Sequence, residues 1–294
     1  MKLISVLLTG ALISSGGAPL RAEDEPVVLQ PSTNWHLDYG EERCRLVRLF
    51  GPEDDQTVFW IEQTGPSASF SWLIAGGIVD HLGTKRSLTA AFGDFAPFDF
   101  NTSGEPVSRQ SLELGKYGDA LQGRGYERPK EEMAPTSVPP LLNLDAGARI
   151  DHVDFYRKGR SARLNTGQLK AAFDAMNACS ANLYEHWGLK AGELDQIAQG
   201  ARPLNMERVA RRIQQHYPLT AERRGENATI ELKMLIGVDG KVEKCIFIKK
   251  TKAENFDDKA CQIMMSDAQF EPASDAQGNP VRDFYSATVH YHMQ

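Results

Sequence analysis

Residues 228–250 read ATIELKMLIGVDGKVEKCIFIKK, two strand-forming runs joined by Asp-Gly at positions 239–240. Asp-Gly between alternating runs is a strong β-hairpin signal, because both turn positions must accept a positive φ. Along the second run, Cys245 points to one face of the sheet, whereas Ile246 and Ile248 point to the other. Both faces are therefore apolar. A helix of the same domain can cover one face. The other face must be covered by the N-terminal part of the chain, by a second subunit or by a partner.

The segments on either side of this hairpin have helical spacing. One helix is predicted between a candidate N-cap at Asn205 and a stop at Pro218, and a second runs from about Phe256 to Ala268. The chain closes with another alternating run at 284–291. The order helix, strand, strand, helix, strand predicts an α+β domain of roughly ninety residues, which we place at 196–294.

The part of the chain that precedes this domain has a different sequence pattern. From about Asn34 to Gly167, short strand-like runs end at glycine: CRLVRLFG, TVFWIEQTG, SFSWLIAGG, SLTAAFG, HVDFYRKG and SARLNTG. This punctuation predicts a β-sandwich or a partly closed barrel. Residues 168–188 then carry apolar side chains at spacings of three, four and seven, which indicates an amphipathic helix. We assign 23–195 to this β-rich domain, with a surface loop at 123–140.

The N-terminus reads MKLISVLLTGALISSGGAPLRAEDEP, with one early lysine and an apolar run that ends at Ile13. A run of this length is too short for a bilayer, because a spanning helix needs about 20 apolar residues. The pattern predicts a secretory signal peptide at 1–22, cleaved after Ala22 or, as a second choice, after Ala18. An uncleaved short anchor is the alternative.

Export places the thiols in an oxidising compartment. The four cysteines are Cys44, Cys179, Cys245 and Cys261, and an even number in an exported chain favours two disulfides. Of the three possible connectivities, local separation selects Cys245–Cys261 and leaves Cys44–Cys179. The first bond would hold the second helix against the sheet and contribute about 3 kcal/mol. The second would join the helix at 168–188 to the first predicted strand.

Several motifs of the C-terminal segment occur in a recognisable order. They are YP at 217–218, DG at 239–240, Asp257, FEPA at 270–273 and GNPV at 278–281. Together they resemble the C-terminal domain of TonB-like energy transducers over residues 202–294. The resemblance implies two helices packed on a small antiparallel sheet. The predicted fold class is thus α+β, a β-rich N-terminal domain followed by a TonB-like C-terminal domain.

The resemblance also implies how a partner binds. In TonB-like domains a short extended segment of an outer-membrane transporter adds a strand to the exposed edge of the sheet. Carried onto this sequence, the receptive edge is the last strand. The expected partner-binding residues are Tyr217, Pro218, Arg282, Phe284, Tyr285, Thr288, Val289 and Tyr291.

The predicted function is therefore partner binding without chemistry or a cofactor, in the periplasm, with a link to outer-membrane transport. Transducers usually keep an N-terminal membrane helix and a long Pro-rich spacer, and this sequence shows neither. The alternatives are a transducer that retains its N-terminal segment as an anchor, an envelope enzyme with its site in the N-terminal domain, and a homodimer formed through the second sheet face.

Residue patterns for chemistry are weak. His290 and His292 share one strand face with no familiar metal-ligand spacing around them, so no metal site is predicted. The NTG triplet at 165–167 lacks the aspartate that an aspartic protease needs to activate water. The formal charge of −6 argues against a nucleic-acid partner, because phosphate neutralisation needs clustered cations.

Overall fold

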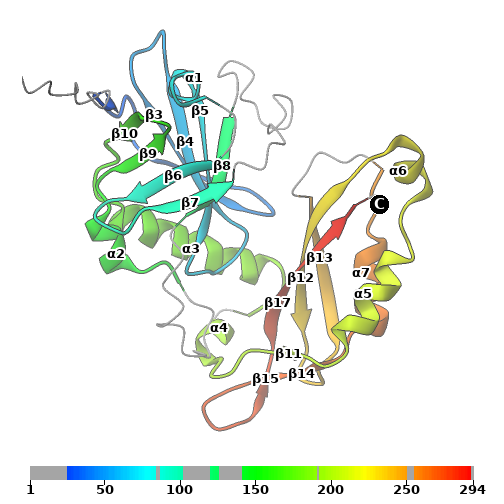
Figure 1. Ribbon diagram of the computed structural model, residues 1–294. Coiled ribbons are helices and arrows are strands. Elements are labelled where there is room, and N and C mark those ends of the chain that lie inside the picture. The colour runs from blue at the N-terminus through cyan, green and yellow to red at the C-terminus, as the bar shows by residue number, and fades with distance from the viewer. Residues whose placement is uncertain are drawn as a thin grey trace, which may run out of the picture.

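The computed structural model of the 294-residue chain describes residues 25–83, 87–101, 120–125, 141–190, 192–249 and 255–292. The predicted signal peptide at 1–22 and positions 126–140 of the predicted loop lie outside these ranges. Figure 1 shows a β-rich N-terminal unit beside a smaller C-terminal unit, and this mixture of helices and sheets confirms the α+β class. Among the described helices, none has the length and apolar character needed to cross a bilayer.

Within the described residues, the N-terminal unit contains two five-stranded sheets. The first has the order β1 (Val27–Leu29), β10 (Arg160–Leu164), β9 (Val153–Arg157), β6 (Ser87–Phe92), β7 (Phe98–Asn101). The second has the order β2 (His36–Tyr39), β3 (Cys44–Phe50), β4 (Thr57–Gln63), β5 (Phe70–Gly76), β8 (Ala120–Gly125). β1 runs parallel to β10, and the other neighbouring pairs are antiparallel.

The inner faces of the two sheets share one core. The rings of Trp72 and Phe155, from opposite sheets, lie 5.3 Å apart between centroids. Helix α3 (Lys170–His186) packs on this core, as its amphipathic spacing predicts. The Cys44–Cys179 disulfide joins α3 to β3, with an Sγ–Sγ distance of 1.96 Å and both cysteines buried. The predicted staple between helix and sheet is confirmed.

Six strands of this unit, β3, β4, β5, β6, β9 and β10, follow the six predicted runs. The short strands β1, β2, β7 and β8 were not predicted, nor were helices α1 (Gly77–Leu82) and α2 (Leu144–Arg149). β1, β2, β7 and the two helices carry too few positions for a periodic signal, and neighbouring elements define them. The sequence of β8, ALQGRG, does not alternate, and its residues 123–125 were wrongly assigned to the predicted loop at 123–140. Asn143 is the clearest local cue, because its side chain caps α2 by accepting from the N–H groups of Asp145 and Ala146.

The C-terminal unit has the predicted order of main elements. They are α5 (Met206–Gln214), β12 (Ala228–Ile236), β13 (Val242–Lys249), α7 (Lys259–Asp267) and β17 (Asp283–Tyr291). Smaller elements surround them: α4 (Glu193–Gln196), β11 (Arg202–Pro203), α6 (Leu219–Arg224), β14 (Phe270–Glu271), β15 (Ala273–Ser274) and β16 (Pro280–Val281). Helix α6 was missed because Pro218 was interpreted only as a stop. Its φ of −64° also suits a helix start.

The predicted hairpin is present, but its turn differs from the expected two-residue type. Strand pairing ends at Ile236 and Val242, and the N–H of Gly237 donates to the carbonyl of Lys241. Gly240 has a positive φ of 76°, whereas Asp239 does not. Gly240 is required for a second reason, since a Cβ there would lie 2.1 Å from the carbonyl oxygen of Phe270. The longer turn therefore makes room for β14.

A candidate partner-binding edge

The sheet of the C-terminal unit ends in an edge strand. Its order is β13-β12-β17, and β12 pairs with β17 from Ala228↔Tyr291 to Ile236↔Asp283. Among the described residues, no strand pairs with the other side of β17 (Figure 1). An unpaired edge presents main-chain N–H and C=O groups to any extended segment that approaches it. This is the edge at which strand addition is expected.

One face of this sheet, which we call the helical face, is covered by α5 and α7 of the same unit. Its buried side chains come from alternate positions of β12: Ala228, Ile230, Leu232, Met234 and Ile236. The Cys245–Cys261 disulfide joins β13 to α7, with an Sγ–Sγ distance of 1.93 Å and a Cα–Cα distance of 5.5 Å. The pairing predicted from local separation is confirmed.

Three aromatic side chains gather on the helical face at the C-terminal end of β17. The ring of Tyr291 lies 4.9 Å from that of Phe256 and 5.5 Å from that of Tyr217, between centroids. The hydroxyl of Tyr217 donates to the carbonyl of Glu226 at 2.5 Å. Burial raises the pKa of Tyr291 to about 12, so this hydroxyl stays neutral. The structure thus brings Tyr217 to the predicted edge.

The opposite face, which we call the inter-unit face, carries Leu235, Ile246, Ile248 and Phe284 and packs on the N-terminal unit. Ile248 is completely buried there. The ring of Phe284 lies 4.3 Å from that of Tyr184 and 5.9 Å from that of Trp187, both near the end of α3. The sequence left three possibilities for what covers this face: the N-terminal part of the chain, a second subunit or a partner. In the structure the N-terminal unit covers it.

A chain of polar contacts crosses the same interface. The hydroxyl of Thr64 donates to the carboxylate of Glu231 at 2.9 Å, and Lys233 Nζ lies 2.7 Å from that carboxylate and donates to Ser286 at 2.8 Å. Ser286 also bonds to the hydroxyl of Tyr184, whose pKa burial raises above its ordinary value. Thr64, Tyr184 and Lys233 are buried, and buried polar groups tolerate few alternative arrangements, so the bonds that Thr64 and Tyr184 make across the interface favour one docking of the two units.

The segment that contains β17 matches a known protein family. Residues 213–293 match the family of Gram-negative bacterial TonB protein C-terminal domains. The match begins at the end of α5 and covers β12, β13, α7 and β17, so the C-terminal unit is a TonB-like domain, as the motif order predicted. Domains of this family are protein-interacting modules linked to outer-membrane transport rather than enzymes. No curated protein gives a significant match to the chain.

The predicted partner-binding residues occupy two different surroundings on the TonB-like domain. At the C-terminal end of β17, Thr288 is exposed and Val289 is half-buried. At the other end, Phe284 is buried and Arg282 forms an ion pair with Glu193 of α4 at 2.5 Å. The other predicted contacts are half-buried or covered: Tyr217, Pro218, Tyr285 and Tyr291. Arg282 and Phe284 are therefore engaged within the chain, and a direct role for them in partner binding stays a prediction.

Residues from the N-terminal unit complete the surroundings of the edge and were not predicted. Tyr184 and Trp187 are two of the aromatic residues of an amphipathic helix, so their sequence pattern indicates only a core. The sequence around Gly65 does not indicate its contact with Tyr184 either, although a Cβ at this position would lie 2.5 Å from that ring. Lys233 could have indicated this contact, because a lysine inside the run IELKMLI must either snorkel or find a buried partner, but it was not predicted.

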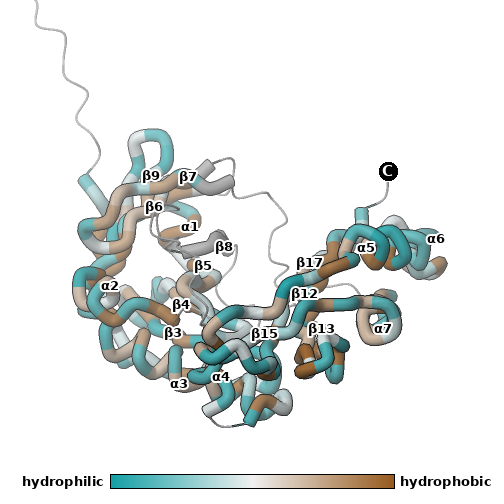
Figure 2. The backbone as a smooth tube through the Cα atoms, turned by 90° about the horizontal axis from the view of Figure 1, so that it is seen from below, coloured by the Kyte–Doolittle hydropathy of each residue, from teal (hydrophilic) through white to brown (hydrophobic). Residues whose placement is uncertain are grey.

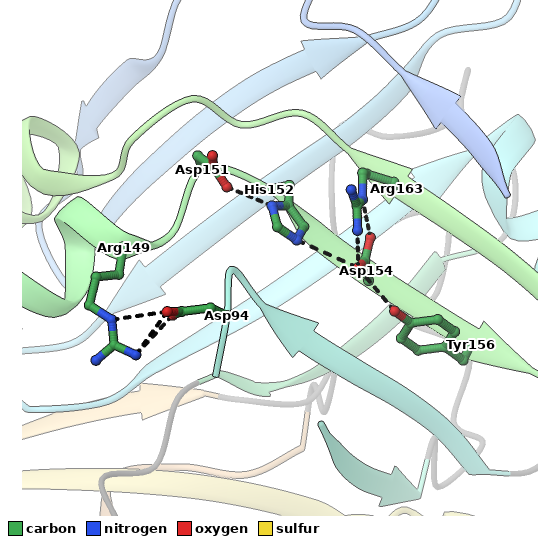
Figure 3. A network of polar contacts seen from close by, with 7 residues as sticks. All are labelled: Asp94, Arg149, Asp151, His152, Asp154, Tyr156 and Arg163. Atoms are coloured by element: carbon green, nitrogen blue, oxygen red, sulfur yellow. Dashed lines mark hydrogen bonds and ion pairs between the residues drawn. The ribbon is translucent and has the colours of Figure 1, made fainter. Parts of the chain in front are cut away.

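A second polar cluster lies on the outer face of the first sheet, far from the TonB-like domain in sequence. Asp154 accepts from Arg163 at 2.6 and 2.7 Å and from the hydroxyl of Tyr156 at 3.0 Å, with His152 at 3.6 Å (Figure 3). Burial alone would raise the pKa of Asp154, but the hydrogen bonds from Arg163 and Tyr156, with the charge of Arg163, outweigh it and lower the pKa. A carboxylate engaged in this way is a poor general base, so the cluster is best explained as a structural tie between β9 and β10.

The side chains that could bind a metal ion are dispersed over the described residues. No group of three or more His, Cys, Asp or Glu side chains is arranged to hold a metal ion in the described part of the chain. The rings of His290 and His292 stack 6.0 Å apart near the end of β17. They are surface features of the TonB-like domain, next to its open edge.

Proposed function

We propose that this chain is an exported periplasmic protein that binds an extended segment of a partner protein along β17, in a process linked to outer-membrane transport. The observation that carries the proposal is the unpaired edge of β17 in a sheet that belongs to a TonB-like domain. The two disulfides fit an oxidising compartment. The N-terminal unit then serves as a scaffold that orients the module.

Strand addition depends on main-chain hydrogen bonds, so it can be tested by proline substitution. Successive N–H groups of a strand point alternately to its two sides. Of Thr288→Pro and Val289→Pro, one therefore removes a group bonded to β12 and the other a group on the open side. The variant with the smaller loss of thermal stability identifies the open-side position. Alanine at the same two positions is the matched control, because it keeps both N–H groups.

Partner capture is measured in living cells by placing a photo-cross-linking amino acid at Val289 and identifying the product by mass spectrometry. We expect a cross-link to one envelope protein, lost in the open-side proline variant and kept in the alanine variant. Full retention with proline would rule out strand addition at this edge. The predicted cleavage after Ala22 is tested on the same material by the intact mass of the exported protein.

A further inference from the structure

The two ends of β17 differ in how closely the rest of the chain approaches them. At the N-terminal end, the buried carboxylate of Asp283 accepts from the N–H of Ala201 at 2.9 Å, and a Cβ on Gly200 would lie 3.3 Å from it. The guanidinium of Arg282 reaches Glu193 of α4 at 2.5 Å. Figure 1 shows α4 and the end of α3 beside this base of the strand. The chain itself therefore occupies the space next to residues 282–284.

The C-terminal end of the strand has no such cover among the described residues. Thr288 and His290 are exposed on one face, and Val289 is half-buried on the other, next to Tyr291 and Tyr217. Figure 2 views the molecule from below, with α3 and α4 on the same side as the N-terminal unit and α5, α6 and α7 on the far side of the sheet. Among the described elements, the helices that flank the distal part of β17 lie on its helical face.

An added strand needs a lateral spacing of about 4.8 Å along the whole length that it pairs. We propose that the end of α3, together with the following segment 193–201, closes the base of β17, so that a partner segment pairs only with positions 287–291 until the contact around Phe284 opens. This inference rests on the proposed function of β17. It adds a control element, because the packing of Phe284 on Tyr184 and Trp187 then sets how much of the edge is available.

The open part of the edge also defines the kind of partner. An extended segment alternates its side chains between the two faces of the sheet that it joins. On the helical face it meets Val289 and the aromatic rings of Tyr217 and Tyr291, and on the other face it meets Thr288 and His290. The best occupant is a short extended segment of another protein in which apolar and polar residues alternate. A stretch of about five residues makes few main-chain bonds, so pairing in the closed state is weak.

The closure can be measured on the protein alone by hydrogen–deuterium exchange. In the parent protein we expect the open-side amides of 282–286 to exchange at least tenfold more slowly than the open-side amides of 287–291. Phe284→Ala removes the contact with α3 and should raise exchange at 282–286 by tenfold or more. Ile246→Ala is the matched control, because it weakens the same inter-unit face on β13, away from the edge, and should leave 282–286 unchanged. Equal exchange of both segments in the parent would overturn the closure.

Partner access is then compared at two positions on the same face of the strand. A photo-cross-linking amino acid at Val289 should react with the partner in the parent, whereas one at Tyr285 should react only when combined with Phe284→Ala. Equal products at Tyr285 and Val289 in the parent would contradict the closure and leave the proposed function standing. Loss of products at both positions would contradict the proposed function, while the exchange result would still decide the closure. A product formed with a second copy of this chain would overturn the assignment of the partner.

Discussion

The two faces of the β13-β12-β17 sheet are both buried, yet they are covered by different means. On the helical face, side chains such as Leu232 and Met234 pack on α5 and α7 of the same unit, and a disulfide fixes α7. On the inter-unit face, apolar contacts of Phe284 and Ile248 surround an ion pair between Lys233 and Glu231. One face is the core of a domain, and the other is an interface with a fixed orientation.

This difference follows from the energetics of burial. Apolar contacts stabilise in proportion to buried area and tolerate repacking, so they hold a fold together. A buried ion pair contributes little net stability, because desolvation offsets the attraction between the charges. Both charges lie on β12, so docking does not separate them, but any docking that moves the N-terminal unit breaks the hydrogen bond from Thr64 to Glu231. Contacts on the helical face thus stabilise the TonB-like domain, whereas contacts on the inter-unit face set its orientation relative to the N-terminal unit.

The largest effect is expected from paired leucine truncations on opposite faces of β12. Leu232 and Leu235 are both almost fully buried, one on each face. Leu232→Ala should lower the free energy of unfolding by about 4 kcal/mol, because the domain core cannot collapse around the cavity. Leu235→Ala should lower it by about 2 kcal/mol, since the two units can shift towards each other. Chemical denaturation measures both values, and a reversed order would contradict the comparison.

The helical face also depends on its disulfide. Cys245 and Cys261 are 16 positions apart, and replacing both by alanine should cost about 3 kcal/mol in the chain-entropy model. The inter-unit face should stay intact in this variant. Trp187 reports on it directly, because its ring packs on Phe284 and the TonB-like domain has no tryptophan of its own. An unchanged tryptophan emission spectrum at low denaturant, together with the lowered stability, is the expected result. A red shift before global unfolding would mean that the two faces are not independent.

The C-terminal unit could be predicted from sequence because its signals are local. Alternation, Asp239-Gly240 and the cysteine spacing each act within a few residues, and together they predicted the main elements and the Cys245–Cys261 bond. The turn type was not predictable in the same way. It depends on the approach of Phe270, about thirty positions from Gly240 along the chain, and no short-range pattern encodes that contact.

The surroundings of the edge were harder to predict, because they depend on docking. Ile246 and Ile248 showed that the second face needs a cover, but nothing in the sequence selects the N-terminal unit over a second subunit. Phe284 illustrates the consequence. From the alternating sequence of the last strand, Phe284 was predicted to contact a partner. In the structure its ring packs on Tyr184 of the same chain, a contact that the sequence does not reveal. Lys233, a lysine inside an apolar run, could have indicated such an interface, but the prediction did not use it.

A smaller effect is expected from the buried ion pair. Lys233→Met alone removes the cation that lies 2.7 Å from the carboxylate of Glu231 and should cost about 2 kcal/mol. Combining it with Glu231→Leu removes both charges, and the double variant should recover at least half of that loss. Denaturation of the two variants and of Glu231→Leu alone completes a double-mutant cycle. Additive losses would show that the pair does not act as a unit in fixing the inter-unit face.

The smallest expected effect concerns the pH dependence of Asp283 at the base of β17. Burial raises its pKa, against the hydrogen bonds from the N–H groups of Ala201 and Phe284. Because the folded pKa lies above the unfolded value, the contribution of Asp283 to stability is fully present below the ordinary pKa of about 3.9 and is lost as the pH rises through the folded pKa. Asp283→Asn should therefore gain up to about 1 kcal/mol at neutral pH and nothing at acidic pH.

Asp275 provides the control of opposite sign for this measurement. Hydrogen bonds from the side chain and main chain of Asn279 lower its pKa, so its contribution is present above the ordinary value and is lost as the pH falls through the folded pKa. Asp275→Asn should accordingly destabilise the protein at neutral pH and have no effect at acidic pH. Thermal unfolding between about pH 3 and pH 7 distinguishes the two slopes. If Asp283→Asn also lost stability at neutral pH, the carboxylate would be holding Ala201 and the base of the strand in place at a net gain, and the closure of that end would depend on its charge.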